Sequence, residues 1–239
     1  PQLPQVKVEA TLPCLVPLSA HTPQALQQMA ADLHDYLPQL PADALLDLAA
    51  TRAHRRNHYP YRTGLVAGSI DELAQQLQTL AAQPPATTDN APGKRVFVFS
   101  GQGPQWWRMG RELLETEPVF RDTIVAIDQL LQTHTDDWSL LAELNADEDN
   151  SRLNETAVAQ PAIFALQVGL HALWQSWGIT PHAVVGHSVG EIAAAHVAGI
   201  FTLEEAVRIV YHRARLMQQA TGLGKMAAVA LTPDEANAL

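Results

Sequence analysis

Cysteine is almost absent from the sequence, because Cys14 is the single one among 239 residues. One cysteine cannot form an internal disulfide, which excludes the disulfide-rich secreted class and indicates a reducing, cytoplasmic compartment. No group of cysteine and histidine residues has the spacing of a zinc site. We therefore expect no bound metal and no resident cofactor.

Basic residues and long apolar runs are also scarce. Lysine and arginine together number 15 against 25 acidic residues, which gives a formal net charge of −10. Nucleic acids and anionic membranes repel such a surface, so neither is expected as a partner. The apolar stretch from Ile192 to Phe201 contains His196 and is far shorter than the roughly 20 residues of a membrane span. The N-terminus lacks the pattern of a signal peptide.

Apolar residues are nevertheless plentiful. They make up 47% of the chain, enough for the core of one large domain or of two ordinary ones. The first part predicts a small β-α-α-β-α unit with strands at 15–18 and 61–67 and helices starting near 22, 42 and 69. A basic cluster, Arg52–Arg56, ends the second helix. It could bind phosphate, but at a helix end its charges more simply complement the dipole and stay in water.

A second domain is predicted behind a linker rich in Pro, Thr and Ala at Gln83–Lys94. Val96–Phe99 is a continuous apolar run, typical of a parallel strand buried on both faces. The glycine-rich loop Ser100–Trp107 follows at the end of the strand where α/β proteins bind ligands. This loop lacks the residues of a P-loop and of a dinucleotide fold, so nucleotide binding is not expected.

The rest of the chain predicts mainly helices around a parallel sheet. They are expected at 109–114, 119–131, 138–144, 161–177 and 202–219, and a further strand at 226–231. Pro161 is assigned to the first position of its helix and Gly178 to the cap at its end. Thr202 and Glu205 form a capping box that opens the last of these helices, and Gly199 ends the helix before it. In the first domain, Ser69 and Glu72 form a capping box for the helix that starts near 69.

The stretch from Val184 to Glu191 has the features of a nucleophile elbow. A short apolar strand ends in Gly-x-Ser-x-Gly, and an alanine-rich helix follows directly. Gly186 and Gly190 leave room for the bent backbone, Ser188 becomes the candidate nucleophile, and the N–H of Val189 can stabilise an oxyanion. The alternatives are a chance match in a loop or a simple helix cap. The strand before the motif and the helix after it favour the elbow.

Arg213 is the second candidate for the site. On a helical wheel of residues 202–219, Arg208 and Arg215 project away from the apolar stripe, whereas Arg213 lies at its edge. A cation there needs an anionic partner, because burying it unpaired is costly. The partner can be a structural carboxylate, a helix C-terminus, or the carboxylate of a substrate. The wheel does not decide among these three.

Four motifs in order carry a family resemblance. They are Val96–Trp107, Gln160–Leu166, Gly186–Glu191 and Tyr211–Gln218. Together they resemble the acyltransferase domain of type I polyketide synthases and, more distantly, the bacterial malonyl-CoA:acyl carrier protein transacylases. The resemblance implies an α/β fold in three parts. Residues 1–94 would be the linker between ketosynthase and acyltransferase, 95–224 the α/β-hydrolase-like large subdomain, and 225–239 the start of a ferredoxin-like small subdomain, here truncated.

The resemblance also implies roles for single residues. Ser188 would become acylated, Arg213 would hold the free carboxylate of a malonyl-type unit, and Gln102 would supply the second oxyanion donor beside Val189. His187 would shape the elbow. The donor would be a malonyl-type acyl-CoA and the acceptor the phosphopantetheine thiol of an acyl carrier protein, with a ketosynthase domain in the same polypeptide.

The chain departs from the family in one respect. The family's general base is a histidine that lies farther beyond the serine than the end of this chain at Leu239. His196 and His212 lie in predicted helices, and neither is assigned as the base. We therefore expect the chain to be an excised piece that needs the rest of the acyltransferase and is inactive alone.

Two other functions stay open at this point. Gly-x-Ser-x-Gly is equally typical of serine esterases and thioesterases, although Arg213 and the glycine-rich loop favour transfer. The piece could also be mainly a structural docking fragment. Val189 and the segment 155–160 look more like malonyl-selective members than methylmalonyl-selective ones, but the deciding motif is not in the chain.

Overall fold

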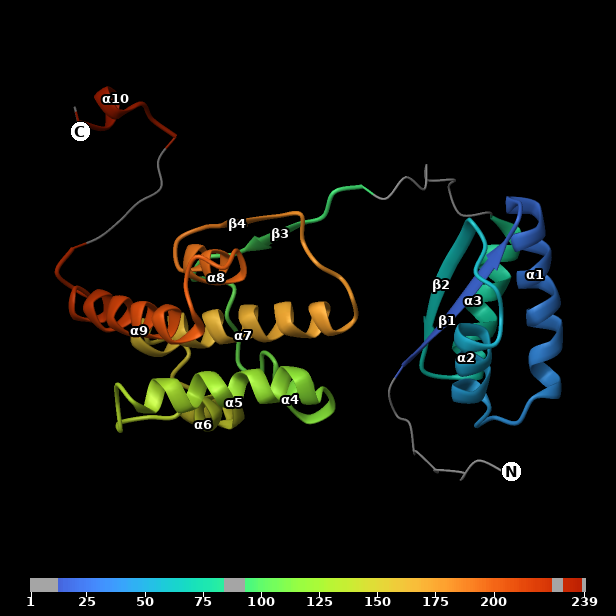
Figure 1. Cartoon of the computed structure of the whole chain (residues 1–239), viewed down its shortest axis with the longest axis horizontal. Helices are drawn as coiled ribbons and strands as arrows, with labels where there is room; N and C mark the ends of the chain where they lie inside the picture. Colours follow the sequence, from blue (N-terminus) through green and yellow to red (C-terminus); the bar gives the residue numbers. More distant parts are fainter. Residues whose placement is uncertain (1–12, 84–92, 225–229, 238–239) are drawn as a thin grey trace. The chain divides into compact units, whose positions relative to one another are not determined.

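The computed structural model describes residues 13–83, 93–224 and 230–237 (Figure 1). The chain divides into two compact units, Pro1–Pro92 and Gly93–Leu239. Most of the predicted linker at 83–94 and most of the predicted strand at 226–231 lie outside the described residues. Each unit is an α/β structure with its own hydrophobic core.

The N-terminal unit is a two-stranded antiparallel sheet with three helices. Its elements are β1 Cys14–Ala20, α1 Pro23–Tyr36, α2 Leu45–His54, β2 Tyr61–Ala67 and α3 Ile70–Ala82, with a short 3-10 turn at Leu37–Gln39. The register runs from the pair Cys14 and Ala67 to the pair Ala20 and Tyr61. Val16 and Leu18 are buried, whereas Leu15, which precedes Val16 in β1, is exposed. The helices therefore cover one face of this sheet, and the predicted β-α-α-β-α order is observed.

Two local details of this unit differ from the sequence prediction. The hydroxyl of Ser69 caps α3 by accepting the N–H of Glu72 at 3.1 Å, but the Glu72 carboxylate accepts from the N–H of Gly68 at 2.8 Å instead of closing the box on Ser69. Arg52 does not stay in water: its guanidinium donates to the carbonyl of Pro17 at 3.4 Å. Burial lowers the pKa of Arg52, and the neighbouring Arg56 adds to this effect.

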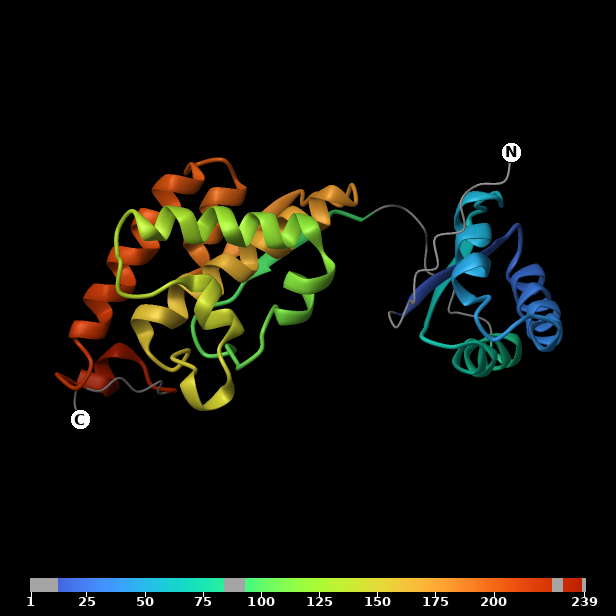
Figure 2. The same cartoon turned by 90° about the horizontal axis from the view of Figure 1, so that it is seen from below.

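The C-terminal unit is built around the long helix α7. Its elements are β3 Val96–Phe99, α4 Arg111–Thr116, α5 Pro118–Gln132, α6 Leu140–Asn145, α7 Thr156–Ser176, β4 Ala183–Gly186, α8 Gly190–Val197, α9 Leu203–Gln219 and α10 Pro233–Asn237, with a 3-10 turn at Glu148–Asn150. Figure 1 shows α7 and α9 between the strands and the layer of α4, α5 and α6. Figure 2, seen from below, has the green and yellow helices of that layer in front.

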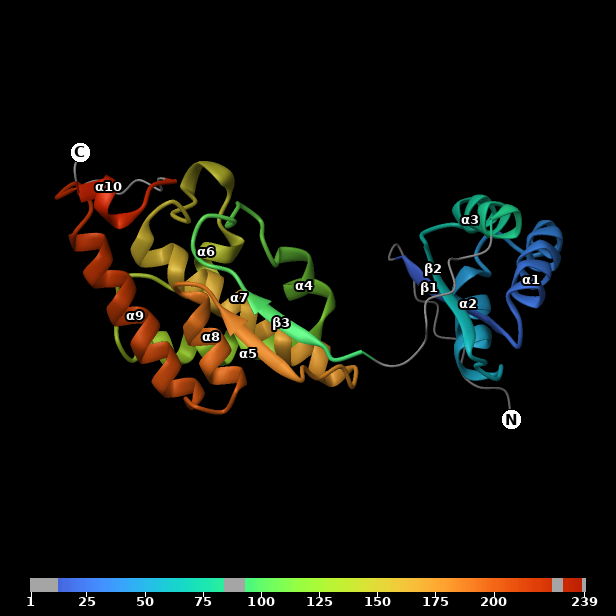
Figure 3. The same ribbon diagram turned by 90° about the horizontal axis from the view of Figure 1, so that it is seen from above.

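Strands β3 and β4 are parallel and lie side by side, as Figure 3 shows from above. The register pairs Val96 with Ala183 and Phe99 with Gly186. The prediction that β3 is buried on both faces is wrong for the described residues, because Val98 is 75% exposed while Phe99 is 4% exposed. Helices of the unit cover one face of the pair, whereas Val96, Val98 and Val185 on the other face are 53%, 75% and 50% exposed.

Helix α7 begins at Thr156, five residues before the predicted start, and Pro161 lies inside it. Proline removes only its own N–H, and the turn before it is closed by the carbonyl of Glu155, which accepts from Ala159 at 2.8 Å. The end is as predicted, because Gly178 has a φ of +75°. By length and composition α7 could cross a membrane, but 67% of its most apolar window is buried inside this unit, as in the core helix of a folded domain.

Helix caps elsewhere in the unit agree with the sequence prediction. Gly199 follows α8 with a φ of +77°. Thr202 and Glu205 form the complete capping box of α9, and α9 ends at Gln219 as expected. Helix α10 begins with the same pattern, since the Glu235 carboxylate accepts the N–H of Thr232 at 2.8 Å.

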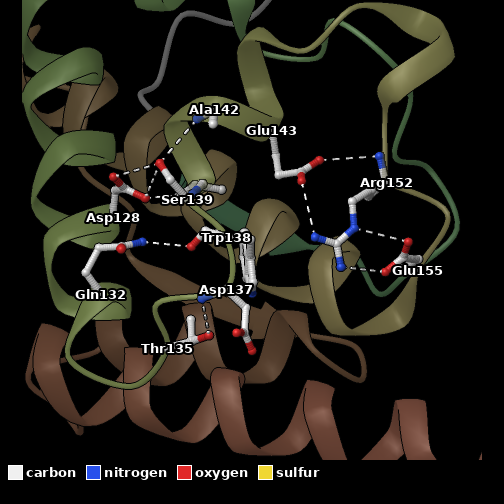
Figure 4. Close-up of polar contacts among 11 residues, drawn as sticks. Asp128, Gln132, Thr135, Asp137, Trp138, Ser139, Ala142, Glu143, Arg152 and Glu155 are labelled. Carbon is white, nitrogen blue, oxygen red and sulfur yellow. Dashed lines mark hydrogen bonds and ion pairs between the residues drawn. The ribbon is translucent and has the colours of Figure 1, made fainter.

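A buried carboxylate joins α5 to α6 (Figure 4). Asp128 is 8% exposed and accepts the N–H of Leu140 at 2.6 Å. Its two oxygens also accept from the hydroxyl of Ser139 at 3.1 and 3.2 Å, and that hydroxyl caps α6 by accepting the N–H of Ala142 at 3.3 Å. Asp128 therefore satisfies backbone donors at the start of α6 that the helix itself leaves open.

Candidate active site

Ser188 lies in a sharp turn between β4 and α8. Its φ of +56° is in the left-handed region that residues with a side chain rarely adopt. A Cβ atom on Gly186 would lie 2.5 Å from the backbone of Glu191, and one on Gly190 would lie 2.2 Å from the carbonyl oxygen of Phe99. Both positions therefore require glycine, and the two glycines allow the turn to present Ser188 at the end of the strand.

The glycine-rich loop after β3 lies directly against this turn. A Cβ atom on Gly101 would be 2.8 Å from Nδ1 of His187 and 3.2 Å from the Cβ of Ser188. The N–H of His187 donates to the carbonyl of Phe99 at 3.0 Å, which extends the β3 and β4 pairing by one residue. His187 thus holds the loop and the turn together through its backbone.

Two backbone donors near Ser188 are unused within the described parts of the chain. No hydrogen bond there takes up the N–H of Gln102 or that of Val189, whereas the N–H of Gly103 donates to the side chain of Gln105 at 2.7 Å. The side chain of Gln102 faces α7, where it donates to Oγ1 of Thr156 at 3.3 Å. The polar group of Gln102 that stays unused there is therefore its backbone N–H, as it is for Val189.

Arg213 reaches Ser188 from α9. Its Nη2 donates to the Oγ of Ser188 at 3.0 Å, and its Nη1 donates to Oε1 of Gln160. No acidic side chain forms an ion pair with Arg213 among residues 13–83, 93–224 and 230–237. The structural carboxylate that the helical wheel allowed is thus not observed in these residues. The guanidinium charge stands beside Ser188 between two neutral groups.

Gln160 is a site residue whose role the sequence analysis missed, since it appeared only as a member of two motifs. It is 1% exposed and comes from the second turn of α7. Its Nε2 donates to Oε1 of Gln102 at 3.2 Å and to the sulfur of Met217 at 3.3 Å. A buried amide on an otherwise apolar helix face is the signal that could have indicated it, because such a group needs polar partners.

The start of α7 is fixed by two further contacts. The N–H of Ala157 donates to Oε1 of Gln218 on α9 at 3.2 Å. Just before the helix, Arg152 donates to both carboxylate oxygens of Glu155, at 3.1 and 2.8 Å, and lies 3.7 Å from Glu143 (Figure 4). This hydrogen bonding lowers the pKa of the Glu155 carboxyl. The turn that carries Gln160 is therefore held from both sides.

No histidine among the described residues forms a hydrogen bond with Ser188. Nδ1 of His196 pairs with the carbonyl of Phe201 at 3.0 Å, and the ring of His212 lies 5.6 Å from that of His134. Burial lowers the pKa of His171, with nearby His196 adding to the effect. None of these makes a hydrogen bond to Ser188, and no group of three metal-binding side chains is found in the same residues. We therefore assign no general base for Ser188 among them.

Protein families and known proteins are similar to this chain along most of its length. Residues 96–239 match the acyl transferase domain family, and residues 14–77 match the family described as CurL-like, PKS C-terminal. The mycocerosic acid synthase-like polyketide synthase of Mycobacterium tuberculosis is 44% identical over 91% of this chain, which corresponds to 10% of that protein. The chain therefore spans a small part of a large multidomain relative.

Solved structures give the same result for the fold. The acyl transferase domain of ZmaA superimposes with a TM-score of 0.80 at 31% identity, over 88% of this chain and 50% of that one. The acyl transferase domain of SpnD, solved in complex with 2-(pent-4-yn-1-yl)malonyl, gives 0.71 at 30% identity, over 85% of this chain and 48% of that one. The chain spans about half the length of these domains. It belongs to the acyltransferase domain family of type I polyketide synthases.

Proposed function

We propose that this chain loads a dicarboxylic, malonyl-type acyl unit from coenzyme A onto Ser188 and passes it to the phosphopantetheine thiol of an acyl carrier protein. One observation carries the proposal: Arg213 donates to the nucleophile at 3.0 Å and has no acidic partner in the described residues. A guanidinium in that position is suited to a second carboxylate on the acyl group.

The reach of Arg213 fits a malonyl unit. In an acyl-serine the ester carbon is bonded to Oγ, and in a malonyl group the free carboxylate is only one methylene carbon farther. A cation already within hydrogen-bond distance of Oγ can therefore meet that carboxylate without a large movement. The bidentate geometry of guanidinium and carboxylate makes the contact directional as well as strong. An acetyl unit offers no such contact.

The proposed chemistry has two steps. In the first, Oγ of Ser188 attacks the thioester carbon, its proton passes to a general base outside the described residues, and the C–S bond breaks to release the thiol of coenzyme A. In the second, the phosphopantetheine thiol attacks the serine ester, the acyl group leaves with the thiol sulfur, and Ser188 regains its proton. The N–H groups of Gln102 and Val189 would stabilise the oxyanion in both steps.

Malonyl is proposed over methylmalonyl on the sequence alone, because Val189 and the segment 155–160 resemble malonyl-selective members. The acyl transferase domain of SpnD was solved with a substituted malonyl group, which supports a malonyl-type unit in general and not malonyl in particular. The match of residues 14–77 supports a further role for the N-terminal unit as the connection to a ketosynthase domain. The expectation that residues 1–239 transfer poorly alone follows from the unassigned base.

The test is acylation of Ser188 in a complete acyltransferase domain that contains this chain. The protein is mixed with malonyl-CoA, and intact-mass measurement follows the added malonyl group before and after an acyl carrier protein is added. We expect an adduct that Ser188→Ala abolishes and that moves to the carrier. Release of free malonate faster than transfer to the carrier would favour the esterase alternative, and no adduct in the wild type would contradict the proposal.

A further inference from the structure

The side chain of Gln160 occupies a junction of three elements. Its carbonyl oxygen accepts from Arg213 on α9, and its amide nitrogen donates to Gln102 in the loop after β3. The same nitrogen contacts the sulfur of Met217, one turn beyond Arg213 on α9. With 1% exposure, Gln160 has no water to replace these partners. Its orientation is therefore fixed, since the oxygen faces the cation and the nitrogen faces the loop.

The chemical type of this residue matters more than its size. A carboxamide aligns the guanidinium of Arg213 by a hydrogen bond and leaves its positive charge uncompensated. A carboxylate at the same place would form a buried ion pair with Arg213, and the pair would be neutral as a whole. Ser188, the other partner of Arg213, is also uncharged as a hydroxyl. The charge is thus available for an anionic ligand only because both neighbours are neutral.

We propose that Gln160 is a positioning residue that gives the site its preference for an acyl donor with a free carboxylate. The inference rests on the proposed function and deepens it. Gln160 holds Arg213 beside Ser188 without neutralising it, so that the carboxylate of the substrate becomes the ion-pair partner. Specificity then arises from a charge that the described residues leave without an ion-pair partner, and a monocarboxylic acyl group has no free carboxylate to pair with it.

The hydrogen bond to Gln102 adds a second consequence. The side chain of Gln102 is held by Gln160 and by Thr156, both on α7, while its backbone N–H remains open beside Ser188. One buried amide therefore connects the residue that would hold the carboxylate to the loop that would stabilise the oxyanion. Loss of the Gln160 amide should weaken both the binding of the carboxylate and the stabilisation of the oxyanion. Only the binding of the carboxylate differs between malonyl-CoA and acetyl-CoA.

Two variants test the inference in a complete acyltransferase domain that contains this chain. Gln160→Glu keeps the shape and introduces the charge, and Gln160→Met keeps an unbranched side chain without the amide. The matched control is Gln175→Glu, because Gln175 lies exposed on the same helix. For each protein, kcat and KM for acylation of Ser188 are measured with malonyl-CoA and with acetyl-CoA, and the thermal transition is recorded.

We expect Gln160→Glu to reduce the malonyl-to-acetyl ratio of kcat/KM by roughly 100-fold or more, because the buried pair would have to be broken by the substrate. Gln160→Met should reduce the same ratio by roughly tenfold, mainly through a higher KM for malonyl-CoA. Gln175→Glu should leave the ratio at the wild-type value. A change in the ratio cannot come from partial misfolding, because misfolding lowers the activity with malonyl-CoA and with acetyl-CoA by the same factor.

Distinct outcomes contradict the inference and the function beneath it. A wild-type protein without preference for malonyl-CoA would overturn the proposed function and this inference together. A wild-type preference that persists in both Gln160 variants would overturn this inference alone. An equal fall of kcat/KM with malonyl-CoA and acetyl-CoA would also overturn this inference and leave Gln160 with a structural role only. If Gln160→Glu fails to fold, Gln160→Met decides by the same ratio.

Discussion

At the scale of single residues, the turn at Ser188 places a left-handed backbone conformation where the proposed chemistry occurs. A left-handed conformation at a residue with a side chain costs on the order of 1–3 kcal/mol and persists only where the surroundings enforce it. Here the surroundings include Gly186, Gly190 and Gly101, where an added Cβ atom would lie 2.5, 2.2 and 2.8 Å from a neighbouring atom. In this turn the Oγ of Ser188 accepts from Arg213 at 3.0 Å.

This close packing predicts a large effect of Gly190→Ala. The added Cβ would lie 2.2 Å from the carbonyl oxygen of Phe99, an atom of the main chain that cannot rotate away. We expect a loss of about 2–4 kcal/mol in the free energy of unfolding, measured by urea denaturation. Gly224→Ala is the control, because no atom lies within 4 Å of its Cβ position. Equal stability of the two variants would show that the turn does not depend on this contact.

Single residues were unequally visible in the sequence. Ser188 and its glycines follow from a local pattern, since strand, turn and helix are contiguous in the chain. The location of Arg213 at the edge of the buried face follows from helical periodicity. Its contact with Ser188 does not, because it joins α9 to the turn before α8, 25 residues away in the sequence. The role of Gln160 is missed by the sequence analysis for the same reason. Its three partners come from other segments, and no local rule connects them.

At the scale of elements, Asp128 shows how one side chain sets the path of the chain. It joins α5 to the start of α6 by accepting the N–H of Leu140 at 2.6 Å and the hydroxyl of Ser139 (Figure 4). Without it, the first backbone donor of a buried helix start would be left without an acceptor. The loop between the two helices would then lose the contact that fixes its end.

We therefore expect Asp128→Ala to lower the free energy of unfolding by about 2–3 kcal/mol, from lost hydrogen bonds and an unsatisfied N–H of Leu140. Asp128→Asn should cost less, since its amide oxygen can still accept. The exposed Asp136, replaced by asparagine, serves as the control. Chemical denaturation followed by near-UV circular dichroism gives the three values. A loss below 0.5 kcal/mol for Asp128→Ala, the typical limit for surface changes, would contradict this role.

Element boundaries were predictable where caps decide them. Helix α9 begins at the capping box of Thr202 and Glu205, as the sequence indicates. Helices α7 and α8 end just before Gly178 and Gly199, which have positive φ. The predicted start of α7 is wrong, because the prediction places Pro161 at the first position of the helix. The extra turn before Pro161 is stabilised by tertiary contacts such as Ala157 to Gln218, which propensity does not contain.

At the scale of the whole molecule, the two units differ in what could be inferred. The alternation of strands and helices in the first unit is local, and its order was predicted in full. In the second unit the run Val96–Phe99 indicated a strand buried on both faces, but Val96 and Val98 are exposed in the described residues. Apolar composition reports the tendency of a strand to be covered, not which segment covers it.

The central claim is that Arg213 holds the carboxylate of the acyl unit. Replacing it with alanine in a complete acyltransferase domain removes a charge-assisted contact worth about 3–5 kcal/mol in a partly buried site. Acylation from malonyl-CoA should then fall by roughly 10²–10³ in kcat/KM, at about tenfold per 1.4 kcal/mol. Acetyl-CoA has no carboxylate to lose, so its kcat/KM should stay or rise, and the preference between the donors should narrow or invert.

Both donors are measured in one preparation of Arg213→Ala, so that misfolding, which lowers both values together, is recognised. Arg208→Ala, an exposed arginine of the same helix, is the matched control and should keep the wild-type ratio. The account predicts a selective loss with malonyl-CoA in Arg213→Ala alone. A parallel fall with malonyl-CoA and acetyl-CoA, or no change in either, would contradict it and make Arg213 a structural cation of α9.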